Sequence, residues 1–385
     1  MLSAAGLVQA AAPVVSNVRA SQRAGAKLVD IYYNLEDSDT GVLSVQILVS
    51  ADGGATWSVP AATFSGAVGG GVTPGLNKHV EWNAGADWDG QFTSRCKVRV
   101  LANDADPLGM ALIPAGSFQM GDPFSDGNSD EKPVHTVQVN AFYLDRTEVT
   151  LTRWREVRNW AAVRNYTFSN EGLAKDWEHP VHTINWYDAV KWCNARSEKD
   201  NLTPVYYTDT SKTTIYKSGE VNLSNDMVLW SANGYRLPTE AEWEKAARGG
   251  LTGQRFPWGL TITHQQANYY SSTGYAYDTS STRGYHPTYA TGSMPYTSPV
   301  GSFPPTGYGL SDMAGNLWER CWDWYGRSYY SDASAGNNPR GPASGGCRVL
   351  RGGSCTHVAN GTRCADRYLP DEENDFIGLR CARGL

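Results

Sequence analysis

The sequence of 385 residues is poor in charge and contains no long apolar run. Only 19% of its residues are charged, its formal net charge is −6, and no run of Lys or Arg exceeds two residues. This pattern argues against nucleic acid or an anionic membrane surface as a partner. No apolar stretch is long enough to cross a bilayer, so we expect no transmembrane segment.

Several catalytic signatures are missing from the sequence as well. It contains no Gly-x-Ser-x-Gly, P-loop or dinucleotide-binding motif, the signatures of common serine hydrolases, NTPases and NAD enzymes. The seven histidines are scattered, and no His-x-x-x-His-x-Glu element occurs among them. Any function must therefore be argued from less common motifs.

Cysteine is present in an odd number. Seven cysteines fit an exported protein with one or more disulfides and one thiol left over. The N-terminus MLSAAGLVQAAAPVV resembles the end of a secretory signal but lacks its basic region. We expect residues 1–12 to be a disordered or remnant signal segment. We also expect the protein to be secreted or held in a bacterial periplasm or cell envelope.

Glycine and aromatic residues are abundant. The chain has 40 Gly, 14 Trp and 21 Tyr, which indicates many turns and irregular loops that are fixed by large side chains. Its length is more than one core normally serves, so two domains are expected.

The N-terminal part has the pattern of an all-β domain. Apolar residues alternate in VLSVQILVS at 42–50 and nearly so in LVDIYYNLE at 28–36, which is the period of a half-buried strand. Turn-forming clusters separate these runs at the spacing of a β-sandwich. We predict an immunoglobulin or fibronectin type III-like sandwich over residues 13–105.

A change in texture marks a second domain. Residues 106–109 are predicted to be a linker, and residues 110–385 show short strands, few helices and long loops. Three helices are expected, over 150–162 and 185–198 and from Thr239 to about Ala247. The last begins with a capping box, because Thr239 is followed three residues later by Glu242.

The second domain resembles the formylglycine-generating enzyme (sulfatase-modifying factor) family. Seven blocks carry this resemblance and occur in the family order. They are MALIPAGSFQMGD (110–122), EKPVHTVQVNAFYLDRTEVT (131–150), HPVHTINWYDAVKWCNA (179–195), GYRLPTEAEWEKAARGG (234–250), RFPWG (255–259), PVGSFPPTGYGLSDMAGNLWE (299–319) and RVLRGGS (348–354). The resemblance implies an α+β, C-type-lectin-like fold with little regular secondary structure.

The resemblance also implies an oxidase that uses copper and O₂ to convert a substrate cysteine to formylglycine. Two thiols in the loop after the Gly-Gly-Ser motif would hold the copper, a ligand choice that suits Cu(I). At the two positions of this pair the chain has His357 and Thr362, whereas its own thiols are Cys355 and Cys364. We therefore predict that the copper pair is absent. A Cys355/His357/Cys364 copper site is the weaker alternative, and a local disulfide or buried thiol is the plain one.

One disulfide follows from the resemblance. It implies a pair between Cys193 and Cys381, which would tie a helix to the C-terminal strand. The sequence leaves the partners of the other five cysteines open, namely Cys96, Cys321, Cys347, Cys355 and Cys364.

Calcium is the metal ion that we expect. The run from Gly315 to Glu319 offers an amide oxygen, backbone carbonyls and a carboxylate, the hard oxygen ligands that Ca²⁺ takes. The resemblance implies a site here, with Asn316 and Glu319 as ligands beside Gly315 and Leu317. A loop brace without metal is the alternative.

A second calcium site is a weaker expectation. The resemblance places it at Asn268 and Tyr269 with a downstream carboxylate, for which Asp278 is the candidate. The alternative of a brace without metal applies to Asp278 with more force, because this loop differs from the family.

Two functions are consistent with these observations. The first is an exported ligand-binding or display protein, which would bind a protein or a small polar ligand with the loop of residues 355–376, called the C-terminal loop below. The same fold serves as the variable protein of diversity-generating retroelements. The second is the copper- and O₂-dependent oxidase. The residues expected to form the ligand-binding surface are Thr356, His357, Asn360, Asp366, Tyr368 and Asp375.

Overall fold

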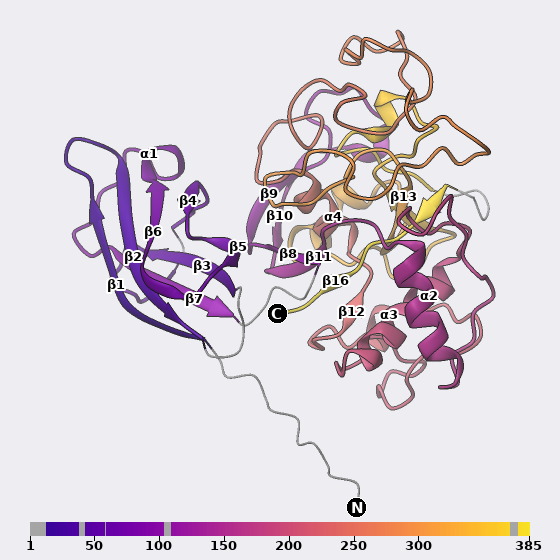
Figure 1. Ribbon diagram of the computed structural model, residues 1–385, viewed down its shortest axis with the longest axis horizontal. Helices are drawn as coiled ribbons and strands as arrows, with labels where there is room; N and C mark the ends of the chain where they lie inside the picture. The colour runs from indigo at the N-terminus through magenta and orange to yellow at the C-terminus, as the bar shows by residue number, and fades with distance from the viewer. Residues whose placement is uncertain (1–12, 38–42, 58, 104–108, 370–375) are drawn as a thin grey trace, which may run out of the picture. The chain divides into compact units, whose positions relative to one another are not determined.

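The computed structural model describes the chain except for residues 1–12, 38–42, 58, 104–108 and 370–375. The chain divides into two compact units between residues 108 and 109 (Figure 1). The predicted signal remnant lies outside the described residues, and so does most of the predicted linker. Among the helices described, none is both long and apolar enough to span a membrane.

Two β-sheets form the N-terminal unit. Strands β2 (Leu28–Glu36), β3 (Leu43–Ser50) and β6 (Gly75–Asn83) alternate inward apolar and outward polar residues. Their side chains Ile31, Tyr33, Val45, Ile47 and Trp82 meet in one core. This confirms an all-β N-terminal sandwich, whereas its immunoglobulin or fibronectin type III-like identity stays a prediction. The first sheet has the order β1 (Val14–Gln22), β2 (Leu28–Glu36), β6 (Gly75–Asn83), β4 (Phe64–Gly66), the second the order β5 (Gly69–Val72), β3 (Leu43–Ser50), β7 (Lys97–Asn103), and a short helix α1 (Ala84–Asp87) follows β6.

The C-terminal unit is an α+β fold dominated by loops, as expected. Between helix α4 (Glu240–Ala247) and strand β13 (Trp318–Trp324), the described chain forms neither helix nor strand and is drawn as loops in Figure 1. Its strands are β8 (Met110–Ile113), β9 (Gly116–Met120), β10 (His135–Val139), β11 (Phe142–Asp145), β12 (Tyr235–Arg236), β13 (Trp318–Trp324), β14 (Arg348–Arg351), β15 (Ile377–Gly378) and β16 (Ala382–Arg383). Its α-helices are α2 (Leu151–Ala162), α3 (Trp186–Lys199) and α4 (Glu240–Ala247), and its 3₁₀ turns cover Ser129–Glu131, Asn225–Met227, Tyr329–Ser331, Ala333–Gly336 and Ala359–Thr362.

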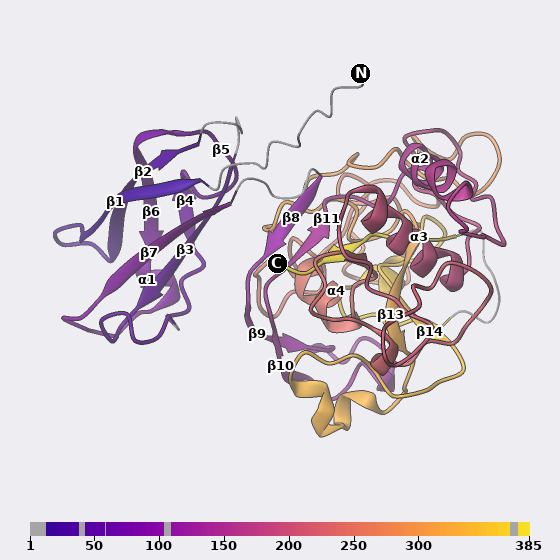
Figure 2. The same ribbon diagram turned by 90° about the horizontal axis from the view of Figure 1, so that it is seen from below.

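The three predicted helices form where their caps place them. The side chains of Thr150 and Asn185 accept hydrogen bonds from the first turns of α2 and α3. Thr239 and Glu242 form the full capping box at α4. Helices α2 and α3 lie side by side in both views (Figures 1 and 2), and the rings of Trp154 and Trp192 stack between them at 5.5 Å.

Short strands from distant parts of the chain build the sheets of this unit. One sheet has the order β12-β16-β11-β8, and another has the order β14-β13-β15, in which β13 and β15 are parallel. The last two strands, β15 and β16, therefore depend on partners far away in sequence.

Buried ion pairs anchor the segment that follows β13. Arg351, Arg363, Arg367 and Arg380 are 0–3% exposed. Their carboxylate partners are Glu244, Glu131, Glu240 and Glu319, in that order. Removing one member of such a pair typically costs about 3–5 kcal/mol, because the other charge stays buried without compensation. The C-terminal loop thus rests on a rigid support.

Candidate functional site

The Gly-Gly-Ser turn after β14 starts the C-terminal loop. Gly353 has a φ of 77°, and a Cβ atom at this position would lie 2.6 Å from the Gly361 carbonyl oxygen. Only glycine fits both requirements. The turn brings the start of the loop against its own 3₁₀ turn and places Cys355 beside Asn316.

Cys355 is a buried thiol. The residue is 1% exposed, and its backbone nitrogen donates to the Asn316 carbonyl at 2.8 Å. Burial raises the pKa of the thiol to about 12. Cys355 is therefore protonated at neutral pH in the metal-free chain, and a metal ion that bound it would have to displace this proton.

Cys364 has the same character in different surroundings. It belongs to the core around α4 and is 1% exposed, and its backbone nitrogen donates to the Arg255 carbonyl at 2.9 Å. Burial again raises the pKa of the thiol to about 12, although Arg248 nearby lowers it in part. Both cysteines are free thiols, so they form no local disulfide with each other.

His357 is held between aromatic rings. Its Nδ1 atom lies 2.8 Å from the Ser354 hydroxyl and accepts a hydrogen bond from Trp318 Nε1 at 3.2 Å. The rings of Trp318 and Tyr368 lie at 4.9 and 5.7 Å from the imidazole ring. Burial lowers the pKa of His357, so the ring is neutral and its Nδ1 is committed to these donors.

The structure does not assemble the alternative copper site. Within the described part of the chain, no three His, Cys, Asp or Glu side chains are placed to hold a metal ion. Cys355 and Cys364 lie among different neighbours, and His357 Nδ1 is hydrogen-bonded to Ser354 and Trp318. The three-ligand copper site stays the weaker of the predictions.

The predicted ligand surface is formed in part. Thr356, His357, Asn360 and Tyr368 are half-buried and reach the surface. Asp366 does not, because it is 5% exposed and lies 3.5 Å from Arg363, so its assignment to the surface is corrected. Asp375 lies outside the described residues.

Three tyrosines next to this loop were not predicted. The half-buried rings of Tyr270, Tyr285 and Tyr296 pack edge to face, at 4.9 and 5.0 Å between neighbouring centroids. The backbone nitrogen of Tyr270 donates to the His357 carbonyl at 2.9 Å. We call these three residues the tyrosine cluster. Their spacing in sequence gave no signal, since a loop pairing brings them together.

The predicted calcium ligands of the first site are already engaged. Asn316 Oδ1 accepts from the Ser298 backbone at 2.9 Å. Both oxygens of Glu319 accept from Arg380, at 2.6 and 2.7 Å, and Trp243 Nε1 donates to one of them. Neither side chain is an open ligand as it stands.

Two other carboxylates at this place have unused oxygens. Glu148 Oε1 and Asp312 Oδ1 are buried atoms without a hydrogen-bond partner among the described residues. Burial raises the pKa of Glu148, to which the charges of Asp312 and Glu319 add. Arg380 opposes these three acids, and a divalent cation would neutralise the excess negative charge. Asp312 lies in the same sequence block as Asn316 and could have been suspected, whereas Glu148 had no local signal.

The three residues of the second predicted calcium site lie together, because Tyr269 follows Asn268 and its hydroxyl donates to Asp278 Oδ1 at 2.7 Å, and the site stays a prediction. The Asn268 amide donates to the Tyr296 carbonyl at 2.8 Å, although its Oδ1 has no partner in the described structure. The Tyr269 carbonyl is 3.1 Å from His264 Nε2. Asp278 pairs with Arg283 at 3.0 Å.

With this geometry, the chain can be compared with known proteins. A family model described as a sulfatase-modifying factor enzyme 1-like domain matches residues 99–385. The chain belongs to this family. The formylglycine-generating enzyme of Streptomyces coelicolor is 31% identical over 305 residues, which cover 71% of this chain and 88% of that enzyme. The enzyme of Thermomonospora curvata is 32% identical over 71% of this chain and 93% of its own length.

Solved structures of the sulfatase-modifying factor fold agree with this assignment. Treponema denticola variable protein 1 has a TM-score of 0.53 and 30% sequence identity, and the match covers 72% of this chain and 95% of that one. The family resemblance and fold class predicted from the sequence are thus confirmed. The match begins at residue 99, inside β7, slightly earlier than the predicted boundary at 110.

The two cysteines that the family resemblance pairs are neighbours. Cys193 and Cys381 are 0% exposed, and their sulfur atoms lie 3.6 Å apart. The two sulfur atoms of a disulfide lie about 2.05 Å apart, so Cys193 and Cys381 are free thiols in this structure. The disulfide therefore stays a prediction, with its partners already in place.

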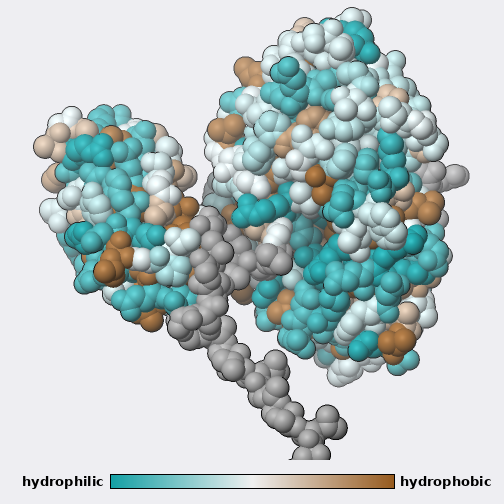
Figure 3. Space-filling view, in the orientation of Figure 1, coloured by the Kyte–Doolittle hydropathy of each residue, from teal (hydrophilic) through white to brown (hydrophobic). Residues whose placement is uncertain are grey.

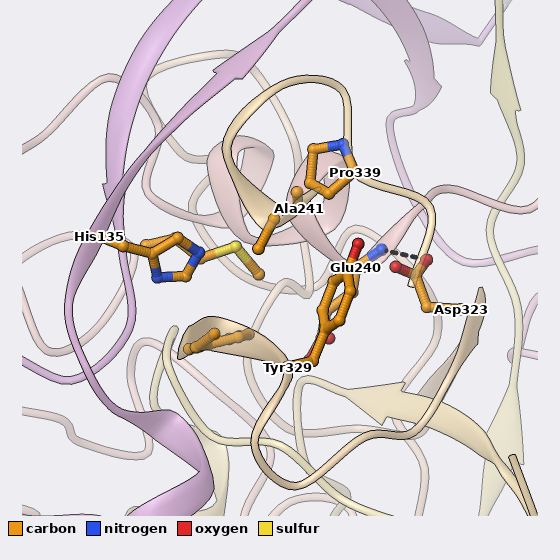
Figure 4. Close-up of a pocket in the computed structure, with 9 residues that line it drawn as sticks. His135, Glu240, Ala241, Asp323, Tyr329 and Pro339 are labelled. Carbon is orange, nitrogen blue, oxygen red and sulfur yellow. Dashed lines mark hydrogen bonds between the residues drawn. The ribbon is translucent and has the colours of Figure 1, made fainter. Parts of the chain in front are cut away.

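The pocket in Figure 4 is too small for an organic ligand. Its volume is about 10 Å³, room for about one water molecule. His135 Nε2 and Tyr330 Oη are buried there without a hydrogen-bond partner among the described residues. Asp323 accepts from the Glu240 backbone at 2.8 Å, the dashed line in Figure 4.

The buried Asp366 predicts a pH dependence of stability. Burial raises its pKa from 3.8 to about 7, so the folded chain holds this proton more tightly than the unfolded one. The stabilising contribution is complete below about pH 4 and is lost as pH rises towards 7. Relative to the native chain, Asp366→Asn should gain about 2 kcal/mol of unfolding free energy between pH 5 and 7.

Urea unfolding of both chains at the two pH values measures this difference. Asp226→Asn, at an exposed position, is the matched control and should follow the native pH profile. Parallel profiles for Asp366→Asn and the native chain would contradict the prediction.

Proposed function

We propose that this protein is an exported ligand-binding or display protein that uses the sulfatase-modifying factor fold without its copper chemistry. The observation that carries the proposal is the identity of the two loop positions that the family resemblance assigns to the copper pair, where the chain has His357 and Thr362. The chain's own loop thiols, Cys355 and Cys364, are each 1% exposed and lie among different neighbours.

The ligand surface combines the C-terminal loop with the tyrosine cluster. Thr356, His357 and Tyr368 offer hydroxyl and imidazole groups, and the tyrosines add rigid rings with polar tips. Such rings supply contact area at a low cost in conformational entropy. Hydrophobic side chains on the visible face of the C-terminal unit occur in separate small patches (Figure 3), so polar contacts and single aromatic rings suit the ligand better than a broad apolar interface.

Variation of this loop is the finer form of the proposal. The likeness to Treponema denticola variable protein 1 supports a protein whose C-terminal loop is diversified by a retroelement. The locus should then show a variable loop and an adjacent template repeat when related isolates are sequenced. An invariant loop without such a repeat would rule out this form and leave the ligand-binding function to be tested by itself.

Binding can be tested with a random peptide library that is selected against the full chain. Peptides retained by the native chain should lose at least about tenfold in affinity for a Thr356→Ala/Tyr368→Ala variant, because a buried aromatic contact is typically worth 1.4 kcal/mol or more. Tyr187→Ala is the matched control, since this tyrosine lies on α3 outside the proposed surface. Equal retention by the native chain and the loop variant would contradict the proposal.

We also propose that one Ca²⁺ binds beside Glu148 and Asp312. Their unused oxygens would supply carboxylate ligands. Asn316 donates to Glu148 Oε2 at 3.1 Å, so the carbonyls of the adjacent Gly315 and Leu317 are the candidates to complete the shell. Calcium would replace the protons that these buried acids otherwise need.

The calcium proposal predicts a stability effect. At about 100 times its dissociation constant, Ca²⁺ should stabilise the native chain by about 2.7 kcal/mol, and Asp312→Asn should lose this gain. Thermal unfolding with Ca²⁺ and with EDTA measures the difference, with Asp226→Asn as the control that keeps it. An identical melting temperature of the native chain in both media would argue against the site.

The alternative function is the formylglycine-generating oxidase. Relatives with this activity are 31–32% identical over most of their length, which favours this reading. It requires a pair of copper-binding thiols, whereas the chain has His357 and Thr362 at the two positions that the family resemblance assigns to them.

A further inference from the structure

The Asp278 loop contains a cage of oxygen atoms around a positive charge of the chain itself. Arg283 Nη1 lies 2.9 Å from the Ser271 hydroxyl, 3.0 Å from Asp278 Oδ1 and 3.3 Å from the Asp278 carbonyl. A carboxylate and a backbone carbonyl are oxygen types that surround Ca²⁺ in proteins. Here both of them, together with the hydroxyl, face one guanidinium nitrogen.

We infer that the guanidinium group of Arg283 occupies the position of a metal ion in this loop. The loop is therefore held together by a positive charge of the chain itself and binds no Ca²⁺. The charge balance supports this assignment. The Asp278 side chain is 0% exposed, and one guanidinium neutralises it. A Ca²⁺ ion would need the same oxygens at about 2.3–2.6 Å and would lie next to a second positive charge.

The remaining lone pairs of the carboxylate are also in use. Asp278 Oδ1 accepts from the Tyr269 hydroxyl at 2.7 Å and from the Ser271 hydroxyl at 2.9 Å. Asp278 Oδ2 accepts from the Ser272 backbone at 2.8 Å. An incoming metal ion would have to displace these donors together with the guanidinium.

The cage fixes the tyrosine cluster. Ser271 and Gly284 exchange two backbone hydrogen bonds of 2.8 and 2.9 Å. They directly follow and precede Tyr270 and Tyr285, so Arg283 is a positioning residue for both rings. This part of the surface should therefore keep its conformation in a medium without calcium.

Calcium titration calorimetry on the full chain tests the inference. Arg283→Ala should bind one Ca²⁺ more per chain than the native protein, because the cage regains a vacant cation position. Arg283→Lys should bind no additional ion, since its ammonium group keeps the charge, and Asp278→Asn in the native background should leave the count unchanged. A lost Ca²⁺ in Asp278→Asn would overturn the inference, as would no gain in a folded Arg283→Ala.

A measurement without mutation guards against variants that do not fold. Limited proteolysis of the native chain should cut the segment 268–284 equally slowly in Ca²⁺ and in EDTA. Faster cleavage there in EDTA would overturn the inference. The calcium count is a difference between variants, so it does not depend on the Asp312 site or on ligand binding by the loop.

Discussion

Oxidation of Cys193 and Cys381 to a disulfide is expected to raise the free energy of unfolding of the C-terminal unit by about 5 kcal/mol. The two residues are 188 positions apart, and closing so long a loop removes much of the freedom of the unfolded chain. Their sulfur atoms already lie 3.6 Å apart, so the bond needs only a small adjustment of the side chains. Urea unfolding of oxidised and reduced protein measures the difference.

Two variants make this test specific. Cys193→Ala/Cys381→Ala should show the same stability under oxidising and reducing conditions. Cys96→Ser removes an exposed thiol of the N-terminal unit and should keep the full redox effect. Equal stability of oxidised and reduced native protein would contradict the pairing.

The burial of this pair also sets when it can oxidise. Burial raises the pKa of Cys193, and the neighbouring Cys381 raises it further. Because thiolates drive disulfide formation, the folded thiols should react slowly. The bond should therefore form during folding in an oxidising compartment, or hardly at all.

Local signals in the sequence were sufficient for the helices. Thr150, Asn185 and Thr239 cap them through side-chain bonds that span three residues, so a short window contains all the information. The strands of the sandwich followed from alternation for the same reason. The family blocks then placed the second domain, whose short strands carry almost no periodic signal.

Contacts between distant residues explain what the sequence did not reveal. Asp366 has a polar side chain in a loop and was assigned to the surface, but Arg363 and its partner Glu131, 232 positions away, bury this part of the loop. The tyrosine cluster likewise depends on the pairing of Ser271 with Gly284. Only the folded chain shows these neighbours.

The calcium prediction shows what a local sequence motif can predict and what depends on distant contacts. The block that ends in Glu319 predicted a calcium site from its oxygen ligands, and in the structure Arg380 pairs with that carboxylate. The unused oxygens belong to Asp312, a few residues earlier, and to Glu148, which approaches from the turn before α2. A motif can locate such a site, whereas the choice of ligands depends on which acids the arginines leave unpaired.

The loop thiols decide between the two functions. Because His357 and Thr362 stand where the family resemblance places the copper-binding thiols, the chain should convert a Cys-x-Pro-x-Arg peptide at least about 1,000-fold more slowly than a working enzyme of the family. The measurement is mass spectrometry of this peptide after incubation with the full chain, copper and O₂. The Streptomyces coelicolor enzyme serves as the positive control.

This assay tests the central claim most directly. We expect no aldehyde product above the level of a Cys355→Ala/Cys364→Ala variant, while the control enzyme converts the peptide. Aldehyde formation by the native chain that disappears in this variant would contradict the account and identify the protein as an oxidase.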